Sequence, residues 1–367
     1  MRIRFRYPII AVVISVGSFF SFANHGLFSY FIHAEEERAI VVQIPNALPP
    51  RAPASVVQND PIPPGICRHI YRTVCRKKTE GKDFTGTVGS DFSGEEQATQ
   101  IEEAIQEQHQ NWSDDQVTEE LIAQIYSPKR VARFQAAYKW VEHKVEKWIE
   151  GQPDAVLSTR EKKILKFRIR HTQLELPPAV RYTDSPDIYT KSDVFYERTS
   201  DGHMRMRVGG AYLLSVKSWF NMLFTLGHEL GHAIDPCEIR ALRIFIPAYD
   251  RLTGCFLEKG FVAITPQRTE CGENDQLSEV FADWLGVKIM DEGIKSYATE
   301  FHGQQLEYAA LNSVRDLCDD DDNDLLINDF HPPARLRIER IFGESPEIQT
   351  MLGCPKPEHP IAYCEFE

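Results

Sequence analysis

One stretch of the sequence decides how the rest is interpreted: Phe224-Thr225-Leu226-Gly227-His228-Glu229-Leu230-Gly231-His232-Ala233-Ile234-Asp235. It contains His-Glu-x-x-His, and apolar residues recur around that motif at three- and four-residue spacing, which predicts an amphipathic helix. Positions i and i+4 share one face of a helix, so His228 and His232 can direct two imidazoles at one metal ion, with Glu229 beside them. Gly227 and Gly231 are poor helix formers, so we expect another element to approach this helix closely. The alternative is a buried amphipathic helix that matches the motif by accident.

A third ligand is available downstream, in a second stretch with helical periodicity over residues 275–286. Glu279 and Asp283 lie four residues apart, on one face. Ionised carboxylates on a largely apolar helix are unfavourable unless positive charge lies opposite them. A zinc ion held by His228, His232 and Glu279 meets that need, and three protein ligands leave a position for water, as in catalytic zinc sites. We then expect Asp283 to accept a hydrogen bond from a ligating imidazole. The alternative is a solvated pair of acidic side chains.

The first 34 residues predict export. Three arginines precede an uncharged, largely apolar run over residues 9–23, and residues 27–32 are apolar again. A basic segment before such a run is typical of a signal peptide, and an uncleaved membrane anchor over residues 9–32 is the alternative. Both interpretations place the remainder outside the cytoplasm, periplasmic or secreted. Residues 35–66 are rich in proline and read as a linker without a core.

Composition and cysteine content agree with an exported enzyme. The net charge of −13 disfavours nucleic acid as a partner, and a hydrophobic fraction of 42% is enough for a sizeable core. The eight cysteines all follow the linker, and an even number in an exported chain favours disulfides over free thiols. Their spacing alone leaves the pairing open. They are Cys67, Cys75, Cys237, Cys255, Cys271, Cys318, Cys354 and Cys364.

The middle of the chain predicts helices and then one hairpin. Helix-starting signals predict helices over residues 93–108, 113–126, 127–151 and 158–171. They form a helical lobe over about 93–175, either a scaffold or a cover for a cleft. Residues 194–208 change to strand periodicity around Ser200-Asp201-Gly202, which predicts a hairpin. It is either an ordinary hairpin or one whose edge pairs with an extended peptide.

These motifs resemble the neprilysin and endothelin-converting-enzyme family of zinc metallopeptidases, which are gluzincins. The zinc helix is similar over His228–Asp235, and the match in the C-terminal segment is the most specific: His331-Pro332-Pro333-Ala334-Arg335-Leu336-Arg337-Ile338, then Ser345-Pro346-Glu347-Ile348 and Gly353-Cys354. The resemblance covers about residues 190–364 and the first cysteine pair. It implies an α+β, mostly α fold: a thermolysin/neprilysin-like zincin domain over residues 67–367, linked by disulfides, with a small antiparallel sheet and a short helical lobe. Its zinc-binding part would span about residues 190–364.

The family is one of zinc endopeptidases, and the resemblance implies the same activity here. One Zn²⁺ would be held by His228, His232 and Glu279, and a zinc-activated water would hydrolyse the peptide bond with Glu229 as general base. His331 would stabilise the oxyanion.

The resemblance assigns supporting roles to other polar residues. Arg337 would bind a substrate carbonyl or carboxylate through its fork of donors, and a structural ion pair is the alternative. Asp283 would orient His228 and share in proton transfer. Asp329 would orient His331, and Asp235 would support the zinc site without binding the metal itself. The segment Asp193-Val194 would grip the substrate backbone, although the family has Asn-Ala there.

The resemblance also implies a disulfide pattern and a substrate class. It pairs Cys67 with Cys354, Cys75 with Cys318 and Cys255 with Cys364, which leaves Cys237 with Cys271 and no family support for that pair. The helical lobe is much smaller than the family's, so we expect an open cleft that admits peptides or unfolded proteins. Two alternatives stand: a soluble Ste24/HtpX-type peptidase, favoured by Glu279-Val280-Phe281-Ala282-Asp283, and a non-catalytic peptide-binding protein on a peptidase fold.

Overall fold

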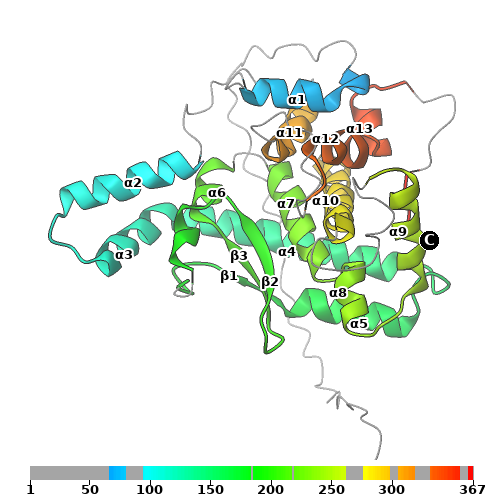
Figure 1. The fold of residues 1–367 in the computed structure, drawn as a ribbon, viewed down its shortest axis with the longest axis horizontal. Coiled ribbons are helices and arrows are strands. Elements are labelled where there is room, and N and C mark those ends of the chain that lie inside the picture. The colour runs from blue at the N-terminus through cyan, green and yellow to red at the C-terminus, as the bar shows by residue number, and fades with distance from the viewer. Residues whose placement is uncertain are drawn as a thin grey trace, which may run out of the picture. The chain divides into compact units, whose positions relative to one another are not determined.

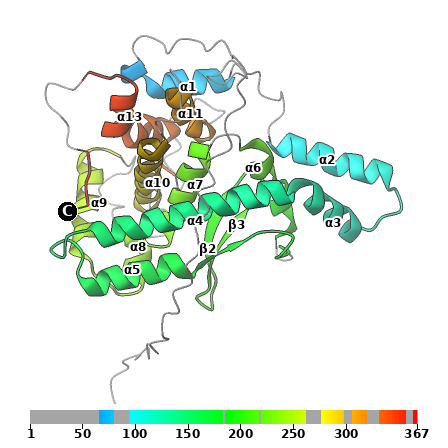
Figure 2. The same cartoon turned by 180° about the vertical axis from the view of Figure 1, so that it is seen from behind.

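Helices make up most of the computed structural model, together with one three-stranded sheet (Figures 1 and 2). The structure describes residues 66–79, 94–182, 185–216, 219–261, 276–297, 305–318, 331–355 and 363–366, which all belong to one compact unit. The predicted export segment and nearly all of the predicted linker lie outside the described residues, as do Cys271 and Asp329.

Four helices of the first half form where helix-starting signals predict them: α2 (Gly94–Gln108), α3 (Asp114–Ile125), α4 (Pro128–Gly151) and α5 (Thr159–His171). The start of α5 shows the mechanism. The backbone N–H of Ser158 donates to Glu161 Oε2 at 2.7 Å, and the Ser158 hydroxyl accepts from the Glu161 N–H at 3.4 Å. The long helix α4 buries Phe134, Val141 and Val145 and packs against the helix that carries the two histidines (Figure 2).

The sheet is mixed, with strand order β1-β3-β2. The predicted hairpin is confirmed: β2 (Val194–Arg198) and β3 (Met204–Val208) pair antiparallel, with Val194 opposite Val208, and Gly202 takes a positive φ of 87° in the turn. The expectation of an antiparallel sheet is wrong for β1 (Thr172–Glu175), which pairs parallel with β3. Residues 172–175 therefore belong to the sheet, not to the helical lobe. The path of α5 sets the direction of β1, and local periodicity does not encode that path.

Two central helices, α7 (Trp219–His232) and α10 (Gln276–Tyr297), pack closely along their length. Small residues permit this approach. A Cβ on Gly231 would lie 2.9 Å from Ala282 Cα, and a Cβ on Gly227 would lie 3.0 Å from Gly286 Cα. The expectation that a neighbour approaches α7 at these glycines is confirmed. The predicted apolar stripe of α10, which includes Phe281, is fully buried.

Short helices complete the frame around this pair. They are α6 (Gly210–Ser215), α8 (Pro236–Ala241), α9 (Pro247–Glu258) and α11 (Gln305–Ser313), with the 3₁₀ segments η1 (Ile66–Arg68), η2 (Pro186–Thr190) and η5 (Arg315–Leu317). Asp235 begins α8 as its N-cap and accepts from the N–H groups of Cys237 and Glu238 at 2.7 and 2.8 Å. That cap sets the sharp turn that follows α7.

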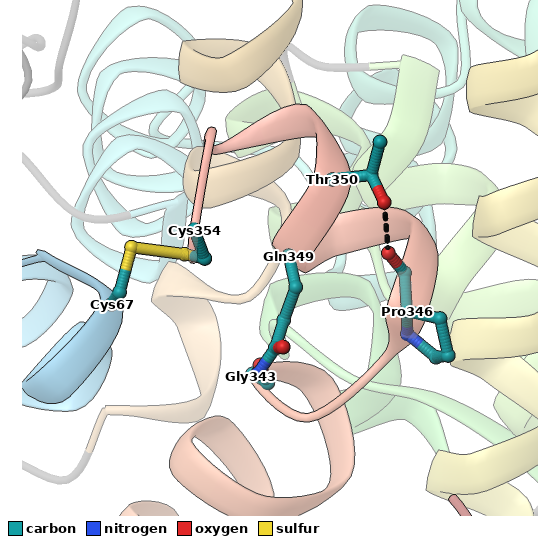
Figure 3. The surroundings of a disulfide bond; sticks show 6 residues. All are labelled: Cys67, Gly343, Pro346, Gln349, Thr350 and Cys354. Carbon is teal, nitrogen blue, oxygen red and sulfur yellow. Dashed lines mark hydrogen bonds between the residues drawn. A yellow bond between two sulfur atoms is a disulfide. The ribbon is translucent and has the colours of Figure 1, made fainter. Parts of the chain in front are cut away.

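Disulfides tie the first helix to the last ones. The end of the chain contributes α12 (Ala334–Leu336), the π-helix η6 (Arg337–Phe342) and α13 (Pro346–Met351), which lie beside α1 (Ile70–Thr79). The bridges are Cys67–Cys354, Cys75–Cys318 and Cys255–Cys364, the three pairs that the family resemblance implies. Figure 3 shows the first of them beside the turn of α13, where the Thr350 hydroxyl donates to the Pro346 carbonyl at 2.7 Å. Cys237 is also disulfide-bonded.

No helix within the described ranges combines the length and the apolar character needed to cross a bilayer. The three bridges indicate an oxidising environment outside the cytoplasm, because thiols in the cytosol are kept reduced.

Candidate metal centre

Three side chains from α7 and α10 converge on one point. His228 Nε2 lies 3.2 Å from His232 Nε2, and the carboxylate of Glu279 lies 3.3 Å from the first nitrogen and 3.6 Å from the second. All three side chains are largely buried. The i, i+4 spacing on α7 aims both imidazoles from one face, and the close approach of α10 brings the carboxylate opposite them.

These separations suit ligands around a small ion. In a tetrahedral site with bonds of about 2.0–2.1 Å, neighbouring ligand atoms stand about 3.3–3.4 Å apart. Glu279 Oε2 is buried and has no hydrogen bond of normal geometry within the described ranges, although imidazole nitrogens lie close to it. A divalent cation would satisfy this oxygen and both imidazole nitrogens at once. The donor set therefore fits a metal.

A third histidine borders the same point. His331 Nε2 lies 3.2 Å from Glu279 Oε2, and His228, Glu279 and His331 offer ligand atoms within 4.8 Å of one another. Two ligand sets are thus geometrically available, with either His232 or His331 as the third member. His232 is the better candidate, because its Nε2 lies 3.2 Å from His228 Nε2 and 3.6 Å from Glu279 Oε1, and its side chain is 16% exposed. The side chain of His331 is 47% exposed and faces solvent at the rim.

Asp283 fixes the first imidazole, as the sequence predicts. Its Oδ1 lies 2.9 Å from His228 Nδ1, so the ring donates there and its Nε2 lone pair faces the convergence point. Arg337 donates from Nε and Nη2 to the two oxygens of Asp283, at 2.7 and 2.8 Å. Of the two roles expected for Arg337, substrate binding and a structural ion pair, these two hydrogen bonds correspond to the second.

The second imidazole has a partner that the sequence analysis missed. His232 Nδ1 lies 3.3 Å from the hydroxyl of Ser278, the residue directly before Glu279, whereas Asp235 Oδ2 is 3.9 Å away. The sequence signal for this contact is that Ser278 directly precedes the expected ligand Glu279. The other oxygen of Asp235 accepts the hydrogen bonds that cap α8.

Glu229 is held by the sheet beside the convergence point. Its Oε2 accepts the backbone N–H of Tyr196 in β2 at 2.7 Å, and its Oε1 lies 3.9 Å from His228 Nε2. Burial raises the pKa of Glu229, an effect opposed by the charges of His228 and His232. The hydrogen bond to Tyr196 was not foreseen, because it joins residues 33 apart in the chain.

The carboxylates make the centre favourable for positive charge. Burial disfavours protonation of His228, but the carboxylates of Asp283 and Glu279 outweigh it and raise the pKa of this imidazole to about 10. Burial likewise opposes ionisation of Asp283, yet Arg337 and His228 lower its pKa to about 2. Burial alone would raise the pKa of Glu279, and the imidazoles of His228 and His331 lower it instead.

The remaining predicted residues, Asp193 and Val194, lie at the N-terminal end of β2. Val194 is buried and Asp193 is exposed, and the carbonyl of Asp193 accepts from the Gly209 N–H at 2.7 Å. The structure therefore places this pair two and three residues before Tyr196, the contact of Glu229.

Comparisons with family models, with curated proteins and with solved structures find no match to this chain.

Proposed function

We propose that this chain is an exported zinc-dependent endopeptidase whose metal is held by His228, His232 and Glu279. The observation that carries the proposal is the convergence of these three groups at separations of 3.2, 3.3 and 3.6 Å, with an orphaned carboxylate oxygen among them. Two imidazoles and one carboxylate form a donor set that suits catalytic zinc, which keeps a position for water.

Each residue of the metal centre then has a role in hydrolysis. Bound zinc would supply an acidified water and polarise the scissile carbonyl. Glu229, held by the Tyr196 N–H, would accept a proton as general base and pass it to the leaving amine. His331 stands at the exposed rim, where an imidazole can donate to an oxyanion. Asp283, with Arg337 behind it, would keep His228 in the orientation that ligation needs.

The resemblance to the neprilysin family supports the same proposal, and with it a zincin fold. Three of its implied disulfides occur, and His331 lies beside Glu279 although 52 residues separate them in the sequence. On this basis the substrate is a peptide or an unfolded protein, bound beside β2. A reduced helical lobe favours long substrates over strictly short ones.

Metal analysis tests the proposal independently of activity. The wild-type chain should hold one zinc ion, and Glu279→Ala should release it, because two imidazoles alone bind zinc much more weakly. Glu292→Ala, an exposed change on the same helix, is the matched control and should retain the metal. Full zinc occupancy in Glu279→Ala would place the third ligand elsewhere.

The base is tested separately. Glu229→Gln keeps the size of the side chain, removes the proton acceptor, and should retain zinc while losing at least about a hundredfold in peptide hydrolysis. Hydrolysis at the wild-type rate by the zinc-loaded variant would remove Glu229 from the reaction.

A further inference from the structure

One edge of the molecule differs in character from the rest of this acidic chain. In the described residues the large apolar side chains that are exposed are Phe167, Leu242, Phe245 and Leu257. The first belongs to α5, and the next two belong to the connection between α8 and α9. Phe245 is the most exposed of the four, at 67%. We call α5 together with residues 236–247 the basic edge.

The two segments of the basic edge form one surface. Both views show α5 and α8, with the start of the connection that follows α8, along the same lower side of the molecule (Figures 1 and 2). The buried side chain of Arg168 joins them: it donates from Nη2 to Glu238 Oε1 at 2.7 Å and from Nε to the Ala233 carbonyl. Arg168 therefore links α5 to the start of α8.

Basic residues are concentrated on this edge. Residues 159–171 and 236–246 carry eight Arg and Lys against two Glu, in a chain whose net charge is −13. Several of these cations pair with acidic groups of their own surroundings. Arg160, Lys163 and Arg243 are exposed and make no ion pair with any residue in the described ranges.

The α8–α9 connection holds its arginine in an unfavourable backbone conformation. Arg243 has a φ of 58°, and it is the one non-glycine residue with positive φ in the described part of the chain. Glycine would suit this position better. An arginine there, between exposed Leu242 and Phe245, gives the connection a cationic and apolar tip.

We propose that the basic edge binds the surface of an anionic lipid bilayer. Exposed apolar side chains interleaved with arginine and lysine match an interface in which rings enter the headgroup level and cations meet lipid phosphates. Phe245 and Leu242 would insert, and Arg160, Lys163 and Arg243 would contact phosphates. An acidic protein or a second copy of this chain would use the charges but would not need lipid.

The test is hydrogen exchange of the full chain mixed with vesicles, because it reports on the edge itself and not on residues 1–34. Vesicles of phosphatidylcholine with phosphatidylglycerol should slow backbone exchange in residues 160–171 and 240–247, and vesicles of phosphatidylcholine alone should not. Arg160→Gln/Lys163→Gln/Arg243→Gln should abolish the protection. Each cation near anionic lipid contributes about a fivefold factor, so affinity should fall about a hundredfold. Arg68→Gln/Lys129→Gln/Lys139→Gln, three exposed cations elsewhere, is the matched control and should behave as wild type.

Two results would overturn the proposal. The first is backbone exchange of the basic edge that both kinds of vesicle slow equally, or that neither slows. Protection that the triple variant of the basic edge retains would count in the same way. The other is slow exchange of the edge without vesicles together with a dimer that Phe245→Ser dissociates, which would assign the edge to a second copy. Circular dichroism and thermal unfolding of each variant show that it is folded before exchange is measured.

Discussion

Asp283 joins α10 to two distant parts of the chain through one buried carboxylate. It receives the Nδ1 hydrogen of His228 from α7 and two hydrogen bonds from Arg337 of η6. Its side chain is 1% exposed and that of Arg337 is 13% exposed, so solvent screens this pair little. Loss of the arginine from this buried carboxylate would therefore strongly destabilise the folded state.

The variant Arg337→Met tests that dependence. It should lower the free energy of unfolding by about 3–5 kcal/mol, because the buried carboxylate of Asp283 loses both hydrogen bonds from the arginine and keeps only the one from His228. Arg340→Met, in the same π-helix, removes an arginine that is 47% exposed and paired with Glu344, and should change stability by about 0–1 kcal/mol. Denaturant unfolding with the disulfides intact compares the two, and equal losses would contradict the account.

Asp291 predicts a pH dependence that is separate from the metal centre. Burial raises the pKa of Asp291 to about 8; its Oδ2 accepts from the Ser345 hydroxyl at 2.8 Å, and its Oδ1 has no hydrogen-bond partner among the described residues. An acid whose pKa is raised on folding stabilises the folded state fully below its unfolded pKa of about 3.9. That contribution is lost as the pH rises through 8.

The variant Asp291→Asn should remove this dependence. It mimics the neutral acid, so at pH 9 it should be more stable than wild type, by on the order of 2–5 kcal/mol, and near pH 4 the difference should vanish. Melting temperatures at several pH values provide the measurement. If the stability of the wild type does not fall relative to that of the variant between pH 4 and pH 9, Asp291 is already ionised in the folded state.

At the scale of elements, the metal centre depends on how closely α7 and α10 approach. Gly231 stands against Ala282 on the facing helix, next to Asp283. The two histidines are on one helix and Glu279 is on the other, so the distance between the helices sets the distance between the ligands. The glycines thus connect packing to metal binding.

Gly231→Ala should separate the helices. Its Cβ would meet Ala282 Cα at 2.9 Å, which forces a backbone shift that costs about 1–3 kcal/mol and weakens metal binding as Glu279 retreats. Gly254→Ala, on α9, meets nothing within 4 Å and should stabilise the chain by about 0.5–1 kcal/mol through helix propensity. Unfolding and zinc affinity of both variants test this, and a harmless Gly231→Ala would mean that the interface is not tightly packed.

The sequence predicts elements well and their pairing poorly, for a physical reason. Periodicity, caps and turn residues are local, so α4, α5 and the β2–β3 hairpin appear where expected. The parallel pairing of β1 and the reach of His331 to Glu279 depend on the path of the chain over many residues. For His331 it was the family resemblance, not local periodicity, that pointed to the centre.

At the scale of the whole molecule, disulfides close the structure around the two central helices. The Cys67–Cys354 bridge spans 287 residues and fastens the segment before α1 to the end of α13 (Figure 3). A cross-link over such a long loop restricts the unfolded chain strongly.

Because the nested Cys75–Cys318 bridge shortens the loop that Cys67–Cys354 closes to about 46 residues, Cys67→Ser/Cys354→Ser should destabilise the folded state by about 4 kcal/mol in the chain-entropy model. The paired substitution avoids a free thiol and leaves the other bridges intact. Thermal unfolding under oxidising conditions measures the loss. A melting temperature equal to that of wild type would show that packing alone holds these ends together.

The central claim is a metal held by two imidazoles and a carboxylate, and zinc-edge X-ray absorption on the purified full chain tests it most directly. We expect one zinc per chain, a first shell of nitrogen and oxygen at about 2.0–2.1 Å with the outer-shell signal of two imidazoles, and no zinc in Glu279→Ala. A sulfur shell at about 2.3 Å, or a wild-type chain that binds no zinc when the metal is supplied, would contradict it.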